Sequence, residues 1–220
     1  MERRLRDRTE AGRLLAQKLE AYANRTDVVV LALPRGGVPV AYEIARRLKA
    51  PLDVFIVRKL GVPWNEELAM GAIASGGVRV LKDDVVKSLR ITEEEIASVE
   101  AKERKELERR ERVYKGNRPA PDVRGRTVIL VDNGVATGTT MLAAIAALKK
   151  LGPARIVVAV AVAPRSTYEE LKAVADEVVC LKTPEIFYAL SMWYENFAQT
   201  TDAEVQDLLA RAARDISVAA

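Results

Sequence analysis

Residues 128–140 of the chain are Val128-Ile129-Leu130-Val131-Asp132-Asn133-Gly134-Val135-Ala136-Thr137-Gly138-Thr139-Thr140. The run 127–131 is rich in β-branched residues, which predicts a buried strand. Residues 139–151 have apolar side chains at helical spacing and predict an amphipathic helix. The loop between strand and helix therefore lies at a helix N-terminus, where unpaired backbone N–H groups and the helix dipole favour a phosphate group.

The loop residues also offer donors, acceptors and room for a ligand. Gly134 and Gly138 let the main chain turn tightly and approach a ligand closely. The hydroxyl donors of the loop are Thr137, Thr139 and Thr140. Asp132 can accept hydrogen bonds from a sugar diol or help to position a metal ion. The alternative is that Asp132, Asn133 and Gly134 only form a turn and that the threonines only cap the helix.

This segment resembles the phosphoribosyl-pyrophosphate motif of type I phosphoribosyltransferases, in which a strand leads into two acidic residues and a Thr-Gly loop. Asn133 stands where the family usually has the second acid, so an acceptor oxygen is kept, the charge is lost and two donors are gained. By this resemblance, Asp132 and Asn133 hold the ribose hydroxyls as catalytic residues, and magnesium bridges pyrophosphate to the ribose with Asp132 as an indirect ligand. The residues implied to bind the 5-phosphate are Gly134, Val135, Ala136, Thr137, Gly138, Thr139 and Thr140.

A second glycine-containing turn, Leu33-Pro34-Arg35-Gly36-Gly37, connects the predicted strand 28–33 to the predicted helix 38–48. Backbone N–H groups in such a turn form an anion-binding nest, and the arginine adds a guanidinium that can clamp an oxyanion. The first loop of type I phosphoribosyltransferases is similar and holds pyrophosphate, so the resemblance gives that role to Arg35, Gly36 and Gly37. Without the 128–140 motif, a plain turn would be the better interpretation.

Arg58 and Lys59 follow the predicted strand 52–57, which places them at the same edge of the sheet. In the family, basic residues at this place precede a mobile loop that closes over the reaction centre. The resemblance therefore implies that Arg58 and Lys59 are catalytic and bind pyrophosphate. Residues 61–67 have loop composition and begin with a hinge-like glycine. The alternative is a solvated basic pair followed by an ordinary surface loop.

The chain has no histidine, which removes the commonest general base and the commonest transition-metal ligand. The remaining chemistry depends on positioning, carboxylates, cations and a hard metal such as magnesium. With 35 basic and 31 acidic residues, the net charge of +4 favours an anionic small molecule over a nucleic acid as partner. Cys180, the single cysteine, has apolar neighbours and is predicted to be an inert strand residue. A charged start and the lack of a long apolar stretch predict a cytoplasmic protein that contacts no membrane.

Strand and helix patterns alternate along the chain, which predicts an α/β domain with an open, mostly parallel sheet flanked by helices. The resemblance implies the type I phosphoribosyltransferase fold, in a single domain over residues 1–220. The other predicted strands are 78–81, with 72–74 before it as a possible hairpin partner, 155–162 and 177–181. The other predicted helices are 13–23 and 166–175. Ligands of such sheets bind beyond the carboxyl ends of the strands.

Two further segments differ from the rest of the chain in composition. Residues 82–118 form a predicted helical insertion, in which a charged helix over 92–115 lies in solvent or packs on a second subunit of a homodimer. Its predicted i,i+4 ion pairs are Glu100 with Arg104, Glu106 with Arg110, Glu108 with Arg112, and Glu111 with Lys115. Residues 182–220 form a predicted hood or tail that ends in a helix over 202–214. Its aromatic residues either stack on an acceptor base or anchor the tail, and they are Phe187, Tyr188, Trp193 and Tyr194.

The resemblance implies transfer of a phosphoribosyl group from phosphoribosyl pyrophosphate to a small nitrogen acceptor, such as a nucleobase, with magnesium as cofactor and a place in nucleotide metabolism. A second hypothesis is a regulator that binds phosphoribosyl pyrophosphate or a nucleotide without catalysis, because Asn133 departs from the family pattern. A phosphate-ester hydrolase is the weakest hypothesis, since the sequence offers no convincing nucleophile or metal cluster.

Overall fold

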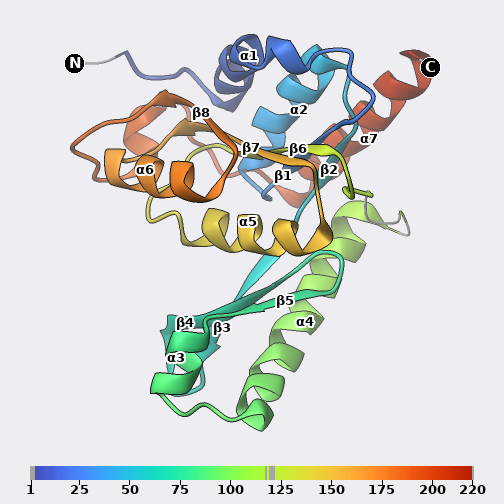
Figure 1. Ribbon diagram of the computed structural model, residues 1–220. Coiled ribbons are helices and arrows are strands. Elements are labelled where there is room, and N and C mark those ends of the chain that lie inside the picture. Colours follow the sequence, from blue (N-terminus) through green and yellow to red (C-terminus); the bar gives the residue numbers. More distant parts are fainter. Residues whose placement is uncertain (1–2, 117, 119–121, 220) are drawn as a thin grey trace.

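The computed structural model describes residues 3–116, 118 and 122–219. Its centre is a five-stranded sheet in which all neighbouring strands are parallel, in the order β2-β1-β6-β7-β8 (Figure 1). These strands are β1 (Val28–Ala32), β2 (Leu52–Val54), β6 (Thr127–Asp132), β7 (Arg155–Val162) and β8 (Glu177–Lys182). Strands β1, β6 and β7 are hydrophobic along almost their whole length because both faces of the sheet are covered. The predicted open, parallel α/β sheet is confirmed.

Helices cover the two faces of this sheet. One face packs against α1 (Arg8–Lys18), α2 (Gly37–Leu48) and α7 (Asp202–Ala219), and its core includes Ile44 and Leu209. The other face packs against α5 (Thr139–Leu151) and α6 (Arg165–Val174), and its core includes Ile145 and Leu171. In Figure 1, α1 and α2 lie above the sheet, whereas α5 and α6 lie below it. Helix α5 has the predicted bounds.

A second, antiparallel sheet and a long helix form an arm that projects from the parallel sheet (Figure 1). The arm consists of β3 (Val57–Val62), β4 (Asn65–Ala74), β5 (Val78–Leu81), α3 (Asp83–Ser88) and α4 (Glu93–Lys115). The arm's sheet packs on α4 and on α5. The predicted hairpin between 72–74 and 78–81 is confirmed as the pairing of β4 with β5.

The predicted strand 52–57 begins correctly at Leu52, but its predicted end is wrong, because the chain crosses from one sheet into the other after Val54. Strand β2 ends at Val54, where Phe55 N donates to Ala32 O at 2.9 Å, and Ile56 N then donates to Ser75 Oγ at 3.0 Å. The apolar run continues across this junction because both sheets bury it, so hydrophobicity alone does not reveal where the strand ends. Arg58 and Lys59 therefore lie inside β3, and the predicted loop 61–67 is a hairpin between β3 and β4.

Helix α4 is fixed at its start by a capping box between Thr92 and Glu95, as its sequence predicts. The predicted ion pairs of Glu100 with Arg104 and of Glu106 with Arg110 are present. Lys115 pairs with Asp53 at 3.5 Å instead of with Glu111. Within the predicted insertion 82–118, residue 117 lies outside the described residues.

Other boundaries differ from the prediction at the ends of the chain. Helix α1 begins at Arg8 instead of residue 13, because Asp7 caps it by accepting from Glu10 N at 2.8 Å. It ends at Lys18, and the 3₁₀ helix η1 (Glu20–Tyr22) follows. Helix α7 starts as predicted and continues to Ala219. Within the described residues, no helix combines the length and the apolar character that crossing a membrane requires.

Candidate functional site

The two glycine-containing loops lie against each other because β1 and β6 are neighbours in the sheet. Leu33 N donates to Val131 O at 2.9 Å where the two strands end. A Cβ atom on Gly37 would lie 2.7 Å from Val131 O, and one on Gly36 would lie 2.9 Å from the Asn133 side chain. Only glycine allows this approach without displacing a neighbour. The predicted ribose motif and the predicted pyrophosphate loop therefore form one continuous surface.

Asp132 and Asn133 form a hydrogen-bonded pair at the end of β6. Asn133 N donates to Asp132 Oδ1 at 2.7 Å. In the orientation of the Asn133 amide that satisfies both polar ends, Nδ2 donates to Asp132 Oδ1 at 2.9 Å and Oδ1 accepts from Arg8 Nε at 3.1 Å. Burial raises the pKa of Asp132 to about 7, although the Asn133 N–H and the charge of Arg8 oppose this rise. The pKa of the carboxyl group thus lies near neutral pH, and both hydrogen bonds from Asn133 go to its Oδ1.

The loop that follows has the form of a phosphate cradle. Gly138, with φ of 72°, is the N-cap of α5, so the free N–H groups of the helix begin at the loop. The loop's exposed residues are Ala136, Thr137, Thr139 and Thr140. Buried Thr167 of α6 donates its hydroxyl to Ala136 O at 2.8 Å, and Val135 N donates to Val162 O at 2.9 Å. The loop is therefore fixed from behind, while its hydroxyl groups face solvent.

Arg35 lies at the edge of this surface, as predicted. The peptide bond between Pro34 and Arg35 is cis. The guanidinium is partly exposed and forms an ion pair of 3.7 Å with Asp202 at the start of α7. Because exposed ion pairs contribute little, an anionic ligand can compete with Asp202 for Arg35.

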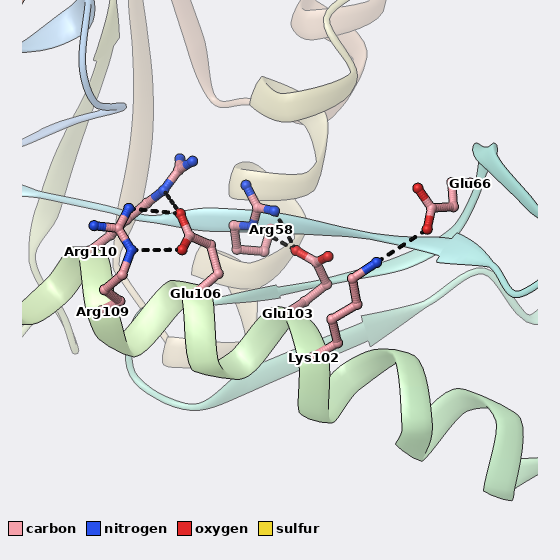
Figure 2. Close-up of polar contacts among 7 residues, drawn as sticks. All are labelled: Arg58, Glu66, Lys102, Glu103, Glu106, Arg109 and Arg110. Carbon is pink, nitrogen blue, oxygen red and sulfur yellow. Dashed lines mark hydrogen bonds and ion pairs between the residues drawn. The ribbon is translucent and has the colours of Figure 1, made fainter.

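Arg58 and Lys59 make their ion pairs within the arm, so the prediction that they follow a strand of the parallel sheet is wrong. Figure 2 shows Arg58 pointing to Glu103 of α4, with Nε and Oε2 2.7 Å apart. Lys59 pairs with Glu67 at 3.8 Å across the β3–β4 hairpin. Both cations line a pocket of about 290 Å³ between the hairpin and α4. The structure therefore joins the turn that carries Arg35 to the Asp132 motif through Gly36 and Gly37, whereas the ion pairs of Arg58 and Lys59 lie within the arm.

The comparison with known proteins agrees with this geometry. A model of the family described as "Phosphoribosyl transferase domain" matches residues 6–192. The chain belongs to the phosphoribosyltransferase family. It is 44% identical in sequence to TT1426 from Thermus thermophilus, and the crystal structure of that protein gives a TM-score of 0.85 over 95% of this chain and 99% of that one. The parallel sheet and its helices are thus a type I phosphoribosyltransferase fold.

Curated relatives of this chain include "Putative phosphoribosyl transferase Rv0571c" of Mycobacterium tuberculosis (strain ATCC 25618 / H37Rv). The two sequences are 47% identical over 213 residues, which cover 97% of this chain and 48% of the relative. A protein from strain CDC 1551 / Oshkosh, "Putative phosphoribosyl transferase MT0597", matches to the same extent. The chain therefore spans about half the length of the curated relatives that it matches.

The aromatic residues before α7 differ in their surroundings. Tyr194 is fully buried, and its hydroxyl donates to Asn133 O at 2.5 Å, which makes it an anchor instead of a stacking surface. Phe187 and Trp193 are partly buried against the core. Tyr188 is 81% exposed and is the one of the four predicted aromatic residues that is free to meet a planar ligand.

Cys180 lies in β8, as predicted, and is not a nucleophile candidate. Its Sγ donates to Lys182 O at 3.1 Å. Burial raises the pKa of the thiol to about 11, so the reactive thiolate is scarce at neutral pH. The interpretation of Cys180 as an inert strand residue therefore agrees with its surroundings.

Sequence reasoning missed three residues that hold the motif. Arg8 bonds to the Asn133 side chain, Tyr194 bonds to the Asn133 carbonyl, and Thr167 bonds to the phosphate loop. Each is distant in sequence from the motif it contacts, and none lies in a recognisable pattern. One weak signal exists for Thr167, since it follows the strand next to β6 and so belongs to the same sheet edge.

Proposed function

We propose that the chain transfers the phosphoribosyl group of phosphoribosyl pyrophosphate to a nitrogen acceptor, expected to be a nucleobase, and releases pyrophosphate. The supporting observation is the glycine contact between two loops. Gly36 and Gly37 let an anion-binding turn pack against Asp132 and Asn133. The N-terminus of α5 lies at the end of the loop that follows these two residues. One ligand with a phosphate at one end, a diol in the middle and a pyrophosphate at the other end fits this order of groups.

Each region has a distinct part in the proposed reaction. The first N–H groups of α5 and the hydroxyls of Thr137, Thr139 and Thr140 bind the 5-phosphate. Asp132 accepts from the ribose hydroxyls. Arg35 and the N–H groups of its turn hold the pyrophosphate. The acceptor nitrogen bonds to the anomeric carbon with inversion, the bond to the pyrophosphate oxygen breaks with its electron pair, and the nitrogen loses a proton. Catalysis comes from alignment and charge stabilisation.

Arg58 and Lys59 are a second, proposed source of positive charge for the pyrophosphate. Their partners in the arm are carboxylates, Glu103 and Glu67, on partly or fully exposed surfaces. The exposed Lys59–Glu67 pair contributes only about 0 to 1 kcal/mol, while the Arg58–Glu103 pair is partly buried. A pyrophosphate group carries more charge than one carboxylate and can displace it, provided that the arm brings the cations to the ligand.

A magnesium ion fits this site if the substrate supplies most of its ligands. Among the described residues, no group of three or more acidic or cysteine side chains is arranged to hold a metal ion. Asp132 Oδ2 is the oxygen that the protein would add, because Oδ1 is bonded to Asn133. When bound, the ion would neutralise charge on the pyrophosphate oxygens. Bound water and substrate oxygens complete a set that this hard ion prefers.

The acceptor is proposed to bind beside the ribose motif, on the exposed side of the segment that precedes α7. A Cβ atom on Gly134 would lie 2.3 Å from Leu190 Cδ1, so this segment covers the motif directly. The exposed large apolar residues of the segment are Ile186 (69%), Tyr188 (81%) and Met192 (57%). Such a surface suits a planar base, with Tyr188 as the stacking residue. A cytoplasmic location and a homodimer remain predictions.

Calorimetry with phosphoribosyl pyrophosphate and Mg²⁺, followed by a pyrophosphate-release assay with a panel of purine and pyrimidine bases, tests the proposal. We expect saturable binding that Asp132→Ala weakens by about 1 to 3 kcal/mol, and pyrophosphate release with at least one base. Binding without release across the panel would favour the regulator hypothesis, which the replacement of the family's second acid by Asn133 also supports. Absence of binding, or an unchanged affinity in Asp132→Ala, would contradict the assigned pocket.

A further inference from the structure

Two segments that are far apart in the sequence pair beside the candidate site. Leu5 N donates to Trp193 O at 2.9 Å, Glu195 N donates to Leu5 O at 2.8 Å, and Asn196 N donates to Arg6 O at 2.9 Å. Arg4 adds a hydrogen bond from its guanidinium to Tyr194 O. Leu5 and Tyr194 are buried, so the pairing is part of the core and not a loose surface contact. We call residues 4–8 and 193–198 the Asn133 clamp.

Both segments of the Asn133 clamp contact Asn133. The Tyr194 hydroxyl donates to the Asn133 carbonyl oxygen at 2.5 Å, in a fully buried position. Arg8 Nε donates to Asn133 Oδ1 at 3.1 Å, while Asn133 Nδ2 donates to Asp132 Oδ1 at 2.9 Å. The amide therefore connects a guanidinium on one side to a carboxylate on the other. The clamp fixes both the backbone and the side chain of this residue.

Arg8 is itself held on several sides. Its Nη1 donates to Ala198 O at 2.7 Å, and its guanidinium carbon lies 4.3 Å from the centre of the Phe197 ring. These contacts add to the bond from Nε to Asn133 and use the face of the group as well as two of its nitrogens. A guanidinium so engaged is suited to hold a neighbour in place, in contrast to Arg35, whose ion pair with Asp202 is 3.7 Å long.

The chemistry of an asparagine fits this place better than that of an aspartate. An amide presents an acceptor to Arg8 and a donor to Asp132 at the same time. An aspartate at position 133 would have no donor for Asp132 and would put two carboxylates in contact, which is unfavourable unless one is protonated. The amide of Asn133 thus matches the positive charge of Arg8 on one side and the negative charge of Asp132 on the other.

We propose that Arg8 is a positioning residue that acts through Asn133 to orient Asp132 toward the ribose of the bound substrate. This inference rests on the proposed function, because it concerns the same pocket. It explains how a site can work with an amide in place of the family's usual second acid: the arginine and the amide together orient the remaining carboxylate. The clamp supplies the rigid frame, since Tyr194 and Phe197 hold the backbone and the guanidinium.

The test compares Arg8→Gln and Arg8→Lys with the control Arg3→Gln. Arg3 also precedes α1, but it is exposed and pairs with Glu10 on the surface. NMR of the Asn133 side-chain NH₂ group, identified by its loss in Asn133→Asp, requires no ligand. In both Arg8 variants we expect the NH₂ resonances to shift toward those of a free amide and hydrogen exchange to accelerate by about tenfold or more. The control should match the wild type.

The second readout is the affinity for phosphoribosyl pyrophosphate with Mg²⁺. We expect Arg8→Gln to weaken binding by about tenfold, Arg8→Lys to weaken it less, and Arg3→Gln to leave it within about twofold. An unchanged NH₂ signal in both Arg8 variants would overturn the inference, as would a changed signal with unchanged affinity. If Arg8→Gln does not fold, Arg8→Lys decides, because lysine keeps the charge but has a single nitrogen in place of the separate Nε and Nη1 donors. Lack of wild-type binding would defeat the proposed function, while the NH₂ readout would still report on the contact between Arg8 and Asn133.

Discussion

The loops at the end of the parallel sheet and the arm differ in the contacts that hold their proposed ligand-binding residues. In the loops, Gly36 and Gly37 lie so close to their neighbours that a Cβ atom at either position would fall inside van der Waals contact distance. Hydrogen bonds from Tyr194 and Thr167 also fix the loop backbone. In the arm, buried apolar residues such as Leu60 and Leu107 form the core, but the face that carries Arg58 and Lys59 is lined by ion pairs such as Arg58 with Glu103 and Lys102 with Glu66 (Figure 2). Packing and buried hydrogen bonds give one geometry, whereas exposed ion pairs can exchange partners. The proposed ribose and phosphate contacts are therefore preformed, and the proposed contacts of Arg58 and Lys59 require rearrangement.

Asp132→Asn should have the largest effect on function and should separate function from stability. Loss of the charged acceptor should weaken binding of phosphoribosyl pyrophosphate by about 1 to 3 kcal/mol, as measured by calorimetry at pH 8. The same variant should be more stable than the wild type at pH 8. The folded-state pKa of about 7 lies above the ordinary value of 3.8, so ionising Asp132 costs the folded state free energy that an amide does not.

The sign of this pH dependence follows from the raised pKa. The folded protein keeps the proton on Asp132 up to higher pH than the unfolded chain, so this group lowers stability as the pH rises from about 4 to 7. Urea unfolding at pH 8 should give Asp132→Asn a free energy of unfolding about 2 kcal/mol above that of the wild type, and the two should be equal near pH 4. This value is roughly half of what the full shift of the pKa would give, because Asp132 is partly accessible to solvent. An equal advantage at both pH values would contradict a buried, titrating carboxyl group.

Gly37→Ala should damage the loops through overpacking. Its Cβ would lie 2.7 Å from a backbone oxygen of Val131, which cannot move without shifting β6. We expect a loss of about 1 to 3 kcal/mol in the free energy of unfolding and a loss of about tenfold or more in affinity for phosphoribosyl pyrophosphate. Gly71→Ala is the matched control in the arm, since its Cβ would lie 2.3 Å from Val80 O. It should lower stability, while the affinity should stay within about threefold. Equal loss of affinity in both variants would break the contrast between the two regions.

The parts that sequence predicts well are those with a strong local pattern. The bounds of α5 and the strand before it follow from apolar spacing, and the capping box of α4 follows from Thr92 and Glu95. The prediction at the β2–β3 junction is wrong because the apolar run over 52–57 is continuous, although the chain leaves one sheet for another within it. Periodicity reports burial, and it does not report which sheet buries the residue.

The supports of the candidate site could not be predicted for another reason. Arg8 and Tyr194 reach Asn133 only after the segments at both ends of the fold have paired. Such contacts depend on tertiary packing, and nothing in the local sequence around either residue specifies the partner. In contrast, Arg35, Asp132 and the phosphate loop lie at strand ends, where topology alone places them at one edge.

Tyr194→Phe should have an intermediate effect. It removes the donor to the Asn133 carbonyl in a fully buried place and leaves that oxygen without this partner. We expect a loss of about 1 to 2 kcal/mol in the free energy of unfolding and a reduction of about threefold to tenfold in substrate affinity. Tyr188→Phe is the control, because Tyr188 is exposed and should change stability by less than about 0.5 kcal/mol. A stability loss without any change in affinity would mean that the Asn133 backbone does not need this support for binding.

The smallest effects on stability should come from variants of the arm's ion pair. The variants of its two partners should change the affinity for substrate in opposite directions. Arg58→Gln and Glu103→Gln each break the same contact, so each should cost no more than about 1 kcal/mol of stability. If Arg58 binds pyrophosphate, Arg58→Gln should weaken substrate binding, whereas Glu103→Gln should leave it unchanged or strengthen it by releasing the guanidinium. Arg109→Gln is the control, because Arg109 pairs with Glu106 on the same helix, where Arg109 and Arg110 lower the pKa of Glu106 to about 2 (Figure 2).

Calorimetry of the three variants at low and high salt shows whether Arg58 exchanges Glu103 for the ligand or whether the Arg58–Glu103 pair is purely structural. Competition between Glu103 and the ligand for one guanidinium predicts opposite shifts in affinity for Arg58→Gln and Glu103→Gln, and these shifts should shrink as salt screens the charges. Parallel losses in both variants would instead mean that the pair supports the shape of the arm, and that Arg58 does not meet the ligand. In that case the preformed loops would carry the whole substrate site, and the charge for pyrophosphate would come from Arg35 and its turn.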